Sequence, residues 1–129
     1  MKKEEKQKPD VTERINSFAD CLQETGMPDV PLFTELPEAL REYFQKQYRL
    51  VVIAEAYNEG VKMDWADSNQ KKYTAWFNMS GGGFVFYGTG SYYSYASAGY
   101  SSRLCFVSDR TIRDAVKKFP DDFKGVITK

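Results

Sequence analysis

The N-terminal part of the chain carries an apolar stripe at helical spacing. Its apolar positions recur every three or four residues, at Val11, Ile15, Phe18 and Leu22. Asp10 followed by Glu13 fits the capping box that begins many helices, and Gly26 is a common residue just after a helix end. The pattern predicts a single helix over residues 10–26.

Residues 37–60, "PEALREYFQKQYRLVVIAEAYNEG", predict a second and longer helix after a connector punctuated by prolines. Pro37 suits the first turn of a helix and Gly60 suits its end. The apolar positions that would form its buried stripe are Leu40, Tyr43, Phe44, Leu50, Val51, Ala54 and Tyr57. The β-branched "VVI" would also suit a strand, but the flanks and the length favour a helix, with a break near Gln47 left open.

Beyond residue 60 the apolar period shortens to the alternation that is typical of strands. "KYTAWFNM" at 72–79 and "FVFYG" at 84–88 are rich in aromatic and β-branched residues and flank "GGG", so they predict a hairpin. "RLCFVS" at 103–108 predicts a third strand. Alternation separates the side chains of the second strand into two faces, Phe84 with Phe86 and Val85 with Tyr87.

The remaining segments connect or close these elements. "DWADSNQ" at 64–70 predicts turns, because Asp and Asn side chains form hydrogen bonds with nearby backbone groups. Residues 88–101 stay open between a long mobile loop and a weak strand pair. Ser108 or Asp109 can cap a last helix, which Pro120 must kink or follow with a new turn. The helical positions of that element are Ile112, Ala115, Val116 and Phe119.

Together these elements predict the α+β class. We expect N-terminal helices, an antiparallel sheet of about three strands, and a closing C-terminal helix packed on the sheet. Residues 1–9 form a polar run that predicts a disordered tail, and residues 10–129 are expected to form a single domain. A length of 129 residues with 42% apolar residues suits one domain with a real core.

Composition removes several classes of function. The chain has no histidine, which excludes Ser-His-Asp and Cys-His catalysis and, with only two cysteines, the usual zinc sites. We therefore expect neither a metal nor an organic cofactor. A formal net charge of zero gives no global basic field for nucleic acid.

The cellular compartment is predicted from the lack of a recognisable targeting signal and from the cysteine content. No apolar segment follows the charged N-terminus, and no apolar run approaches the ~18 residues that would span a bilayer. Cys21 and Cys105 are expected to be buried thiols of a reducing environment. These features predict a soluble, cytoplasmic protein without a membrane partner.

The glycine-rich stretch "SGGGFVFYG" does not predict a nucleotide site. A phosphate-binding loop needs a lysine and a following helix, whereas this stretch leads into an aromatic strand. It partly matches an RNA-recognition signature, but Ser80 stands where a basic residue belongs and Gly82 where a base-stacking aromatic belongs. The simpler interpretation is a hairpin turn that needs positive φ angles.

Paired carboxylates keep an enzyme as a remote alternative. Asp64 with Asp67, and Asp121 with Asp122, would have to share a cleft to act as acid and base. Neither pair lies in a known catalytic motif, and turn or helix-start acids are the simpler interpretation. No catalytic residue is assigned.

The density of aromatic residues between positions 65 and 106 is the strongest functional signal. Tyrosine and tryptophan suit recognition, because they offer a large contact area with a polar tip. The candidate binding residues are Trp65, Tyr73, Trp76, Tyr92, Tyr93, Tyr95 and Arg103. Three interpretations stay open: packing of the sheet and loop, binding of a protein partner, and stacking with single-stranded nucleic acid. The third would use the flanking basic residues Lys71, Lys72, Arg103, Arg110 and Arg113.

Four segments resemble a known family. "EAYNEG" with "DW" just after it, "KYTAWF" and "SRLCF" look like a family of small uncharacterised proteins from Bacteroidales bacteria and their phages and mobile elements. The similarity runs from about Thr12 to Phe119. It implies one intracellular domain in a phage or mobile-element context, and it supplies no catalytic residues. The family's last helix usually lacks a proline at the place of Pro120, which leaves the C-terminal ending open.

Overall fold

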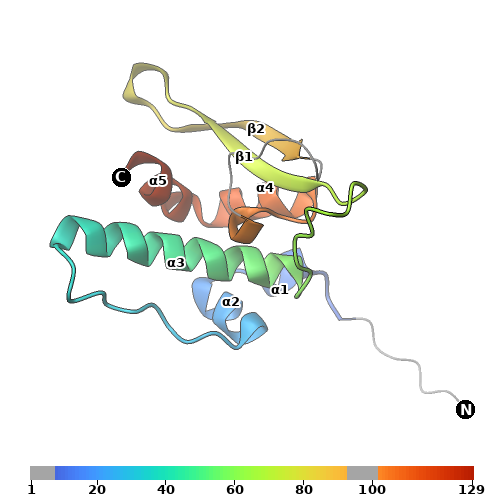
Figure 1. The fold of residues 1–129 in the computed structure, drawn as a ribbon, viewed down its shortest axis with the longest axis horizontal. Coiled ribbons are helices and arrows are strands. Elements are labelled where there is room, and N and C mark those ends of the chain that lie inside the picture. The colour runs from blue at the N-terminus through green and yellow to red at the C-terminus, as the bar shows by residue number, and fades with distance from the viewer. Residues whose placement is uncertain (1–7, 93–101) are drawn as a thin grey trace, which may run out of the picture.

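The computed structural model describes residues 8–92 and 102–129 and combines helices with an antiparallel hairpin (Figure 1), which confirms the α+β class. Its elements are α1 (Val11–Arg14), α2 (Phe18–Thr25), α3 (Glu38–Asn58), β1 (Lys72–Asn78), the 3₁₀ turn η1 (Ser80–Gly82), β2 (Val85–Tyr92), the 3₁₀ turn η2 (Ser102–Leu104), α4 (Asp109–Lys118) and α5 (Pro120–Thr128). The predicted tail at 1–9 and the loop at 88–101 fall largely outside the described residues.

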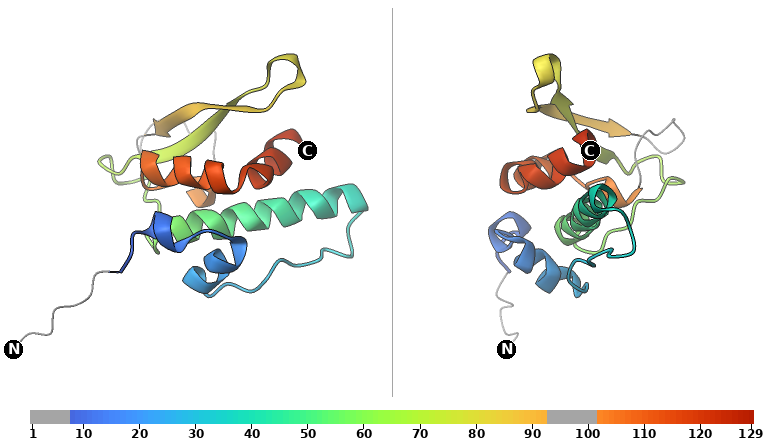
Figure 2. Two further views of the ribbon diagram at one scale, coloured as in Figure 1. Left: turned by 180° about the vertical axis from the view of Figure 1, so that it is seen from behind. Right: turned by 90° about the vertical axis from the view of Figure 1, so that its left-hand side faces the viewer.

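The elements form successive layers. The hairpin lies over α4 and α5, α3 packs beneath those two helices, and α2 packs on the far side of α3 (Figures 1 and 2). The C-terminal half of α3 is therefore enclosed and contributes most of the core. Its fully or nearly fully buried side chains are Leu50, Val52, Ile53, Ala54, Ala56 and Tyr57.

The prediction of one helix over residues 10–26 is wrong, because α1 and α2 are separate helices. Asp10 caps α1 by accepting a hydrogen bond from the backbone N–H of Thr12. The reciprocal capping box forms one turn later, between Ser17 and Asp20, and it starts a new helix there. The backbone at Ile15 is extended, and this side chain is fully buried. The predicted end is confirmed, since Gly26 has a φ of 68°.

The long helix is confirmed, and α3 is continuous through Gln47. Of the predicted buried stripe, Leu50, Ala54 and Tyr57 are buried, whereas Tyr43 and Val51 are only half-buried. Leu40 and Phe44 are 45% and 38% exposed, because the N-terminal end of α3 projects past the other helices (Figure 1). There Phe33 of the preceding connector packs against Phe44 with 5.8 Å between ring centroids.

The hairpin is confirmed, with β1 and β2 antiparallel and a register shift between Trp76 and Phe77. Gly81 and Gly82, with φ angles of 63° and 77°, supply the left-handed conformations that the turn needs. The prediction of a third strand is wrong. Residues 103–108 form η2 followed by a single bridge between Phe106 and Tyr73.

A side chain of α3 binds the edge of this segment that faces away from β1. The amide of Asn58 donates to the carbonyl of Cys105 and accepts from the N–H of Val107, each at 2.9 Å. These backbone groups would otherwise pair with a neighbouring strand. Asn58 thereby attaches the segment before α4 to the end of α3, while Phe106 bonds to Tyr73 of β1 on the other side. The pairing with β1 stops at this one bridge, because η2 ends at Leu104 and Ser108 already caps α4.

The closing element consists of two helices. Ser108 caps α4, and Pro120 begins α5 instead of kinking α4. The helical positions expected to be buried are confirmed at Ile112, Ala115, Val116 and Phe119. Asp121 and Asp122 lie in the first turn of α5, where the helix dipole stabilises negatively charged side chains.

Two buried thiols and a buried phenol are expected to make the fold less stable at alkaline pH. Cys21 and Cys105 are thiols without exposed surface, and burial raises their pKa values from 9.0 to about 12 and about 11. Burial is also the main cause that raises the pKa of Tyr57. The hydroxyl of Tyr57 donates to Asp114 at 2.7 Å, and that carboxylate further opposes a phenolate. In the folded chain all three groups therefore keep their protons where the unfolded chain loses them.

We expect the free energy of unfolding to be fully retained below about pH 8.5 and to fall as the pH rises toward about 11. The sign follows because raised pKa values make the unfolded chain the stronger acid. Urea unfolding in reducing buffer across this range measures the effect. A Cys21→Ala, Cys105→Ala chain should show a shallower decline. A free energy that stays constant or rises over the same interval would contradict the burial of these groups.

Candidate binding surface

The two faces of the hairpin differ in what covers them. Side chains that alternate along β1 point inward at Tyr73, Ala75 and Phe77, and Ala75 is 4% exposed. Phe77 stacks on Phe84 with ring centroids 4.2 Å apart, and it contacts Phe123 of α5 at 5.9 Å. The inner face is therefore fixed to the helices, whereas none of the described helices lies over the opposite face (Figures 1 and 2). On that opposite face Lys72 and Thr74 are fully buried, and exposure begins at Trp76.

Trp76 lies on this outer face and is 51% exposed. Its partner across the hairpin is Gly88. A Cβ atom at Gly90 would lie 2.6 Å from Nε1 of Trp76. The indole can occupy this space only because Gly90 has no side chain. Trp76 is thus an exposed aromatic side chain with a position defined by the neighbouring strand.

Val85 and Tyr87 join Trp76 on the same face. Val85 pairs with Asn78, two residues after Trp76, and Tyr87 follows Val85 by two positions. Val85 is 63% exposed and Tyr87 is 78% exposed. We call Trp76, Val85 and Tyr87 the outer aromatic face. None of the three is charged, and each leaves at least half of its side chain in contact with solvent.

Lys72, which the nucleic-acid interpretation placed on the surface, is fully buried on β1. Its Nζ donates to the carbonyls of Asp64 at 2.7 Å, Gln70 at 2.8 Å and Asp67 at 3.2 Å. It also lies 5.2 Å from the centroid of the Trp65 ring. The loop before β1 therefore folds around the ammonium group, and the hydrogen bonds of Lys72 hold this loop together.

The first carboxylate pair is used in turns. Asp64 accepts from the N–H of Ala66 and Asp67 accepts from the N–H of Asn69, both at 2.9 Å. Both aspartates are exposed, as the turn interpretation requires. Among residues 8–92 and 102–129, no three potential ligating side chains come together in a group that would hold a metal ion.

The other candidate residues lie in different places. Trp65 is half-buried and its indole N–H donates to Ser102, so it fixes the loop. Tyr73 is half-buried on the inner face, and Arg103 lines a cavity beside α3. The structure describes only the backbone of Tyr92, which pairs with Lys72, and the candidates Tyr93 and Tyr95 lie outside the described residues.

Trp76 is thus the one candidate that the described structure places on the outer aromatic face. Val85 and Tyr87 were not among the candidates. A signal for them exists in the sequence, because alternation with Phe84 and Phe86 directs them away from the buried face.

The flanking arginines carry compensated charges. Arg110 pairs with Asp10, and Arg113 pairs with Asp109 at 2.8 Å. Asp109 also accepts from the hydroxyl of Thr89 on β2, and this hydrogen bond is the main reason that its pKa is lowered. These contacts attach α1 and β2 to α4, and they reduce the positive potential available to a phosphate backbone.

In the part of the chain that the structure describes, no helix has both the length and the apolar character that crossing a membrane requires. No protein-family model matches the chain, and no match was found among the curated proteins or the solved structures.

Proposed function

We propose that this protein is a non-catalytic interaction module that binds a protein partner through the outer aromatic face. The observation that carries the proposal is the exposure of Trp76, Val85 and Tyr87 on the side of the hairpin that none of the described helices covers. Tryptophan and tyrosine dominate the energetic centres of protein interfaces, since each buries a large area with few rotatable bonds.

The support beneath the face favours this role. Phe77 and Phe84 stack directly on the inner side, and the indole of Trp76 occupies the room left by Gly90. A side chain that is already positioned loses little conformational entropy on binding. The outer aromatic face is therefore ready to bind without rearrangement of the hairpin.

The chemistry of the face specifies the partner. Because the face is uncharged and aromatic, a complementary surface offers apolar side chains and has no unpaired charge at its centre. We infer a soluble protein partner in the cytoplasm. The resemblance to small proteins of Bacteroidales phages and mobile elements supports an accessory role of this kind.

Single-stranded nucleic acid is the competing partner class. It would need cations beside the aromatic residues, but Lys72 is buried and Arg113 is paired with Asp109. Stacking without phosphate neutralisation gives weak binding. The observations therefore favour a protein, and the experiment below includes nucleic acid as an outcome.

We expect Trp76→Ser with Tyr87→Ser to weaken partner binding at least about 30-fold, which corresponds to about 2 kcal/mol for a central aromatic contact. The partner is identified by chemical crosslinking to the wild-type chain in its native cells, and its affinity is then measured with purified proteins. The fold should be unchanged, because both side chains are half or more exposed.

The matched control is Leu32→Ser, which removes an apolar side chain that is 70% exposed on the connector before α3. It should leave the affinity unchanged. Equal loss from the control and the double variant would contradict the proposal. So would binding of an oligothymidine at low salt that weakens as salt rises and that needs Trp76.

A further inference from the structure

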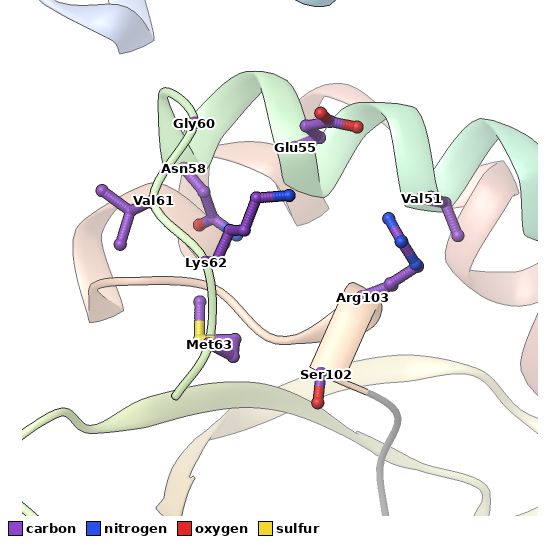
Figure 3. Close-up of a pocket in the computed structure, with 9 residues that line it drawn as sticks. All are labelled: Val51, Glu55, Asn58, Gly60, Val61, Lys62, Met63, Ser102 and Arg103. Carbon is purple, nitrogen blue, oxygen red and sulfur yellow. The ribbon is translucent and has the colours of Figure 1, made fainter. Parts of the chain in front are cut away.

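A cavity of about 230 Å³ lies between α3, the extended segment at 60–63 and η2, away from the outer aromatic face (Figure 3). At about 30 Å³ for each water molecule in the liquid, this corresponds to roughly eight waters. The cavity is smaller than most drug-sized pockets, and it suits a metabolite of about the size of an amino acid.

The walls of the cavity are fixed by buried contacts. Asn58 on α3 binds the backbone of residues 105 and 107, which sets the distance between α3 and the segment after η2. Ser102 accepts a hydrogen bond from the indole of Trp65, which attaches η2 to the loop before β1. The opening is therefore a property of the packed fold, and it does not depend on one exposed side chain.

Charges of both signs line the cavity. Figure 3 shows Lys62 and Arg103 approaching α3 from either side of the hollow, with Glu55 on the helix between them. The Glu55 carboxylate would repel a simple anion in this cavity, and the two positive groups would repel a simple cation. A molecule that carries a carboxylate and an ammonium group can instead place each beside its opposite charge.

Apolar side chains complete the lining. Val51 lies one helical turn before Glu55, and Val61 and Met63 flank Lys62 on the extended segment. Figure 3 shows Val61 directed away from the space between Lys62 and Arg103, so Val51 and Met63 are the apolar groups of the hollow. They suit an aliphatic or thioether side chain, which gains by leaving water. The cavity therefore combines a matched pair of charged subsites with an apolar subsite.

We propose that this cavity binds a free α-amino acid with an apolar side chain. Arg103 and Lys62 bind the carboxylate, Glu55 binds the ammonium group, and Val51 and Met63 contact the side chain. The guanidinium of Arg103 suits this role because its planar donors match a carboxylate. Such a site would make the protein a sensor or carrier of a small zwitterion, independently of any protein partner.

NMR titration of the isotopically labelled chain with L-leucine, L-methionine and L-phenylalanine tests the proposal. We expect at least one of them to bind with a Kd of roughly 1 mM or tighter and to shift the amide signals of residues 60–63. The same amino acid as its amide, which lacks the carboxylate, should bind at least 10-fold more weakly. The N-acetyl derivative, which lacks the ammonium group, should bind more weakly by a similar factor.

Variants separate the two charged subsites. Glu55→Gln should weaken binding of the free amino acid at least about 5-fold and leave the N-acetyl derivative unaffected, whereas Lys62→Gln should weaken both. The control Lys117→Gln changes an exposed lysine of α4 and should weaken neither. The proposal is overturned if none of the three amino acids binds at about 20 mM, or if the derivatives bind as well as the free form.

Discussion

Replacing Lys72 by methionine is expected to lower the free energy of unfolding by about 3 kcal/mol, although the change keeps the length and apolar stem of the side chain. The ammonium group of Lys72 is fully buried and donates to the backbone carbonyls of Asp64, Asp67 and Gln70. Each hydrogen bond from a charged donor contributes about 1.5–3 kcal/mol, and partial hydration of the freed carbonyls returns some of the loss.

The expected result has a local component. Trp65 and the turns at Asp64 and Asp67 are arranged around the ammonium group, so Lys72→Met should loosen the loop as well as the whole fold. Urea unfolding measures the global change, and the rate of proteolysis within residues 61–71 measures the local one. Both should change together.

The neighbouring lysine provides the control. Lys71 is exposed, so Lys71→Met should change the free energy of unfolding by less than about 0.5 kcal/mol. If Lys72→Met is as mild as Lys71→Met, the loop does not depend on the buried ammonium group. Lys72 would then be available as a surface cation, which would restore the nucleic-acid interpretation.

The second large effect is expected at the contact between α3 and α5. Arg49 donates from Nε to Oδ1 of Asp122 at 2.7 Å and from Nη2 to Oδ2 at 3.3 Å. Lys46 adds a weaker contact with Oδ1 at 3.5 Å, and the side chain of Asp122 is 4% exposed. Removing Arg49 therefore leaves a buried carboxylate with most of its compensation lost.

We expect Arg49→Met to lower the free energy of unfolding by about 3 kcal/mol, and Arg49→Met with Asp122→Leu to recover most of that loss. The double variant removes the desolvated charge together with its partner. Arg113→Met is the matched control, because its pair with Asp109 is about half exposed and should contribute less than about 1 kcal/mol. Losses that simply add in the double variant would show that the two side chains do not compensate each other.

Structural features that depend on only a few neighbouring residues could be predicted from the sequence. Asp10 and Ser108 as caps, Gly26 as a stop and Pro120 as a helix start each act through their own backbone or that of the next turn. The hairpin belongs to the same group, because Gly81 and Gly82 determine its turn locally.

Interactions between distant residues account for the errors. Asn58 of α3 binds the backbone of residues 105 and 107 on the side away from β1, and no periodicity in "RLCFVS" indicates that the segment pairs with β1 at Phe106 alone. Lys72 appears in the sequence as one of two adjacent surface lysines. Its burial depends on carbonyls that converge only when the preceding loop has folded.

The candidate surface was partly predictable for the same reason. The density of aromatic residues directed attention to the hairpin, and alternation assigned Val85 and Tyr87 to the face opposite Phe84 and Phe86. What alternation cannot supply is which face the helices cover. That depends on where α4 and α5 pack, and it separates exposed Trp76 from half-buried Tyr73.

Photocrosslinking from the outer aromatic face tests the central claim most directly. A Tyr87→benzoylphenylalanine chain, irradiated in its native cells, is compared with a Leu32→benzoylphenylalanine chain that presents the same group on the connector. We predict that the probe at position 87 yields one discrete protein adduct, which disappears with Trp76→Ser, and that the probe at position 32 yields none. Crosslinks of equal pattern from both positions, or a nucleic-acid adduct from position 87, would contradict the account.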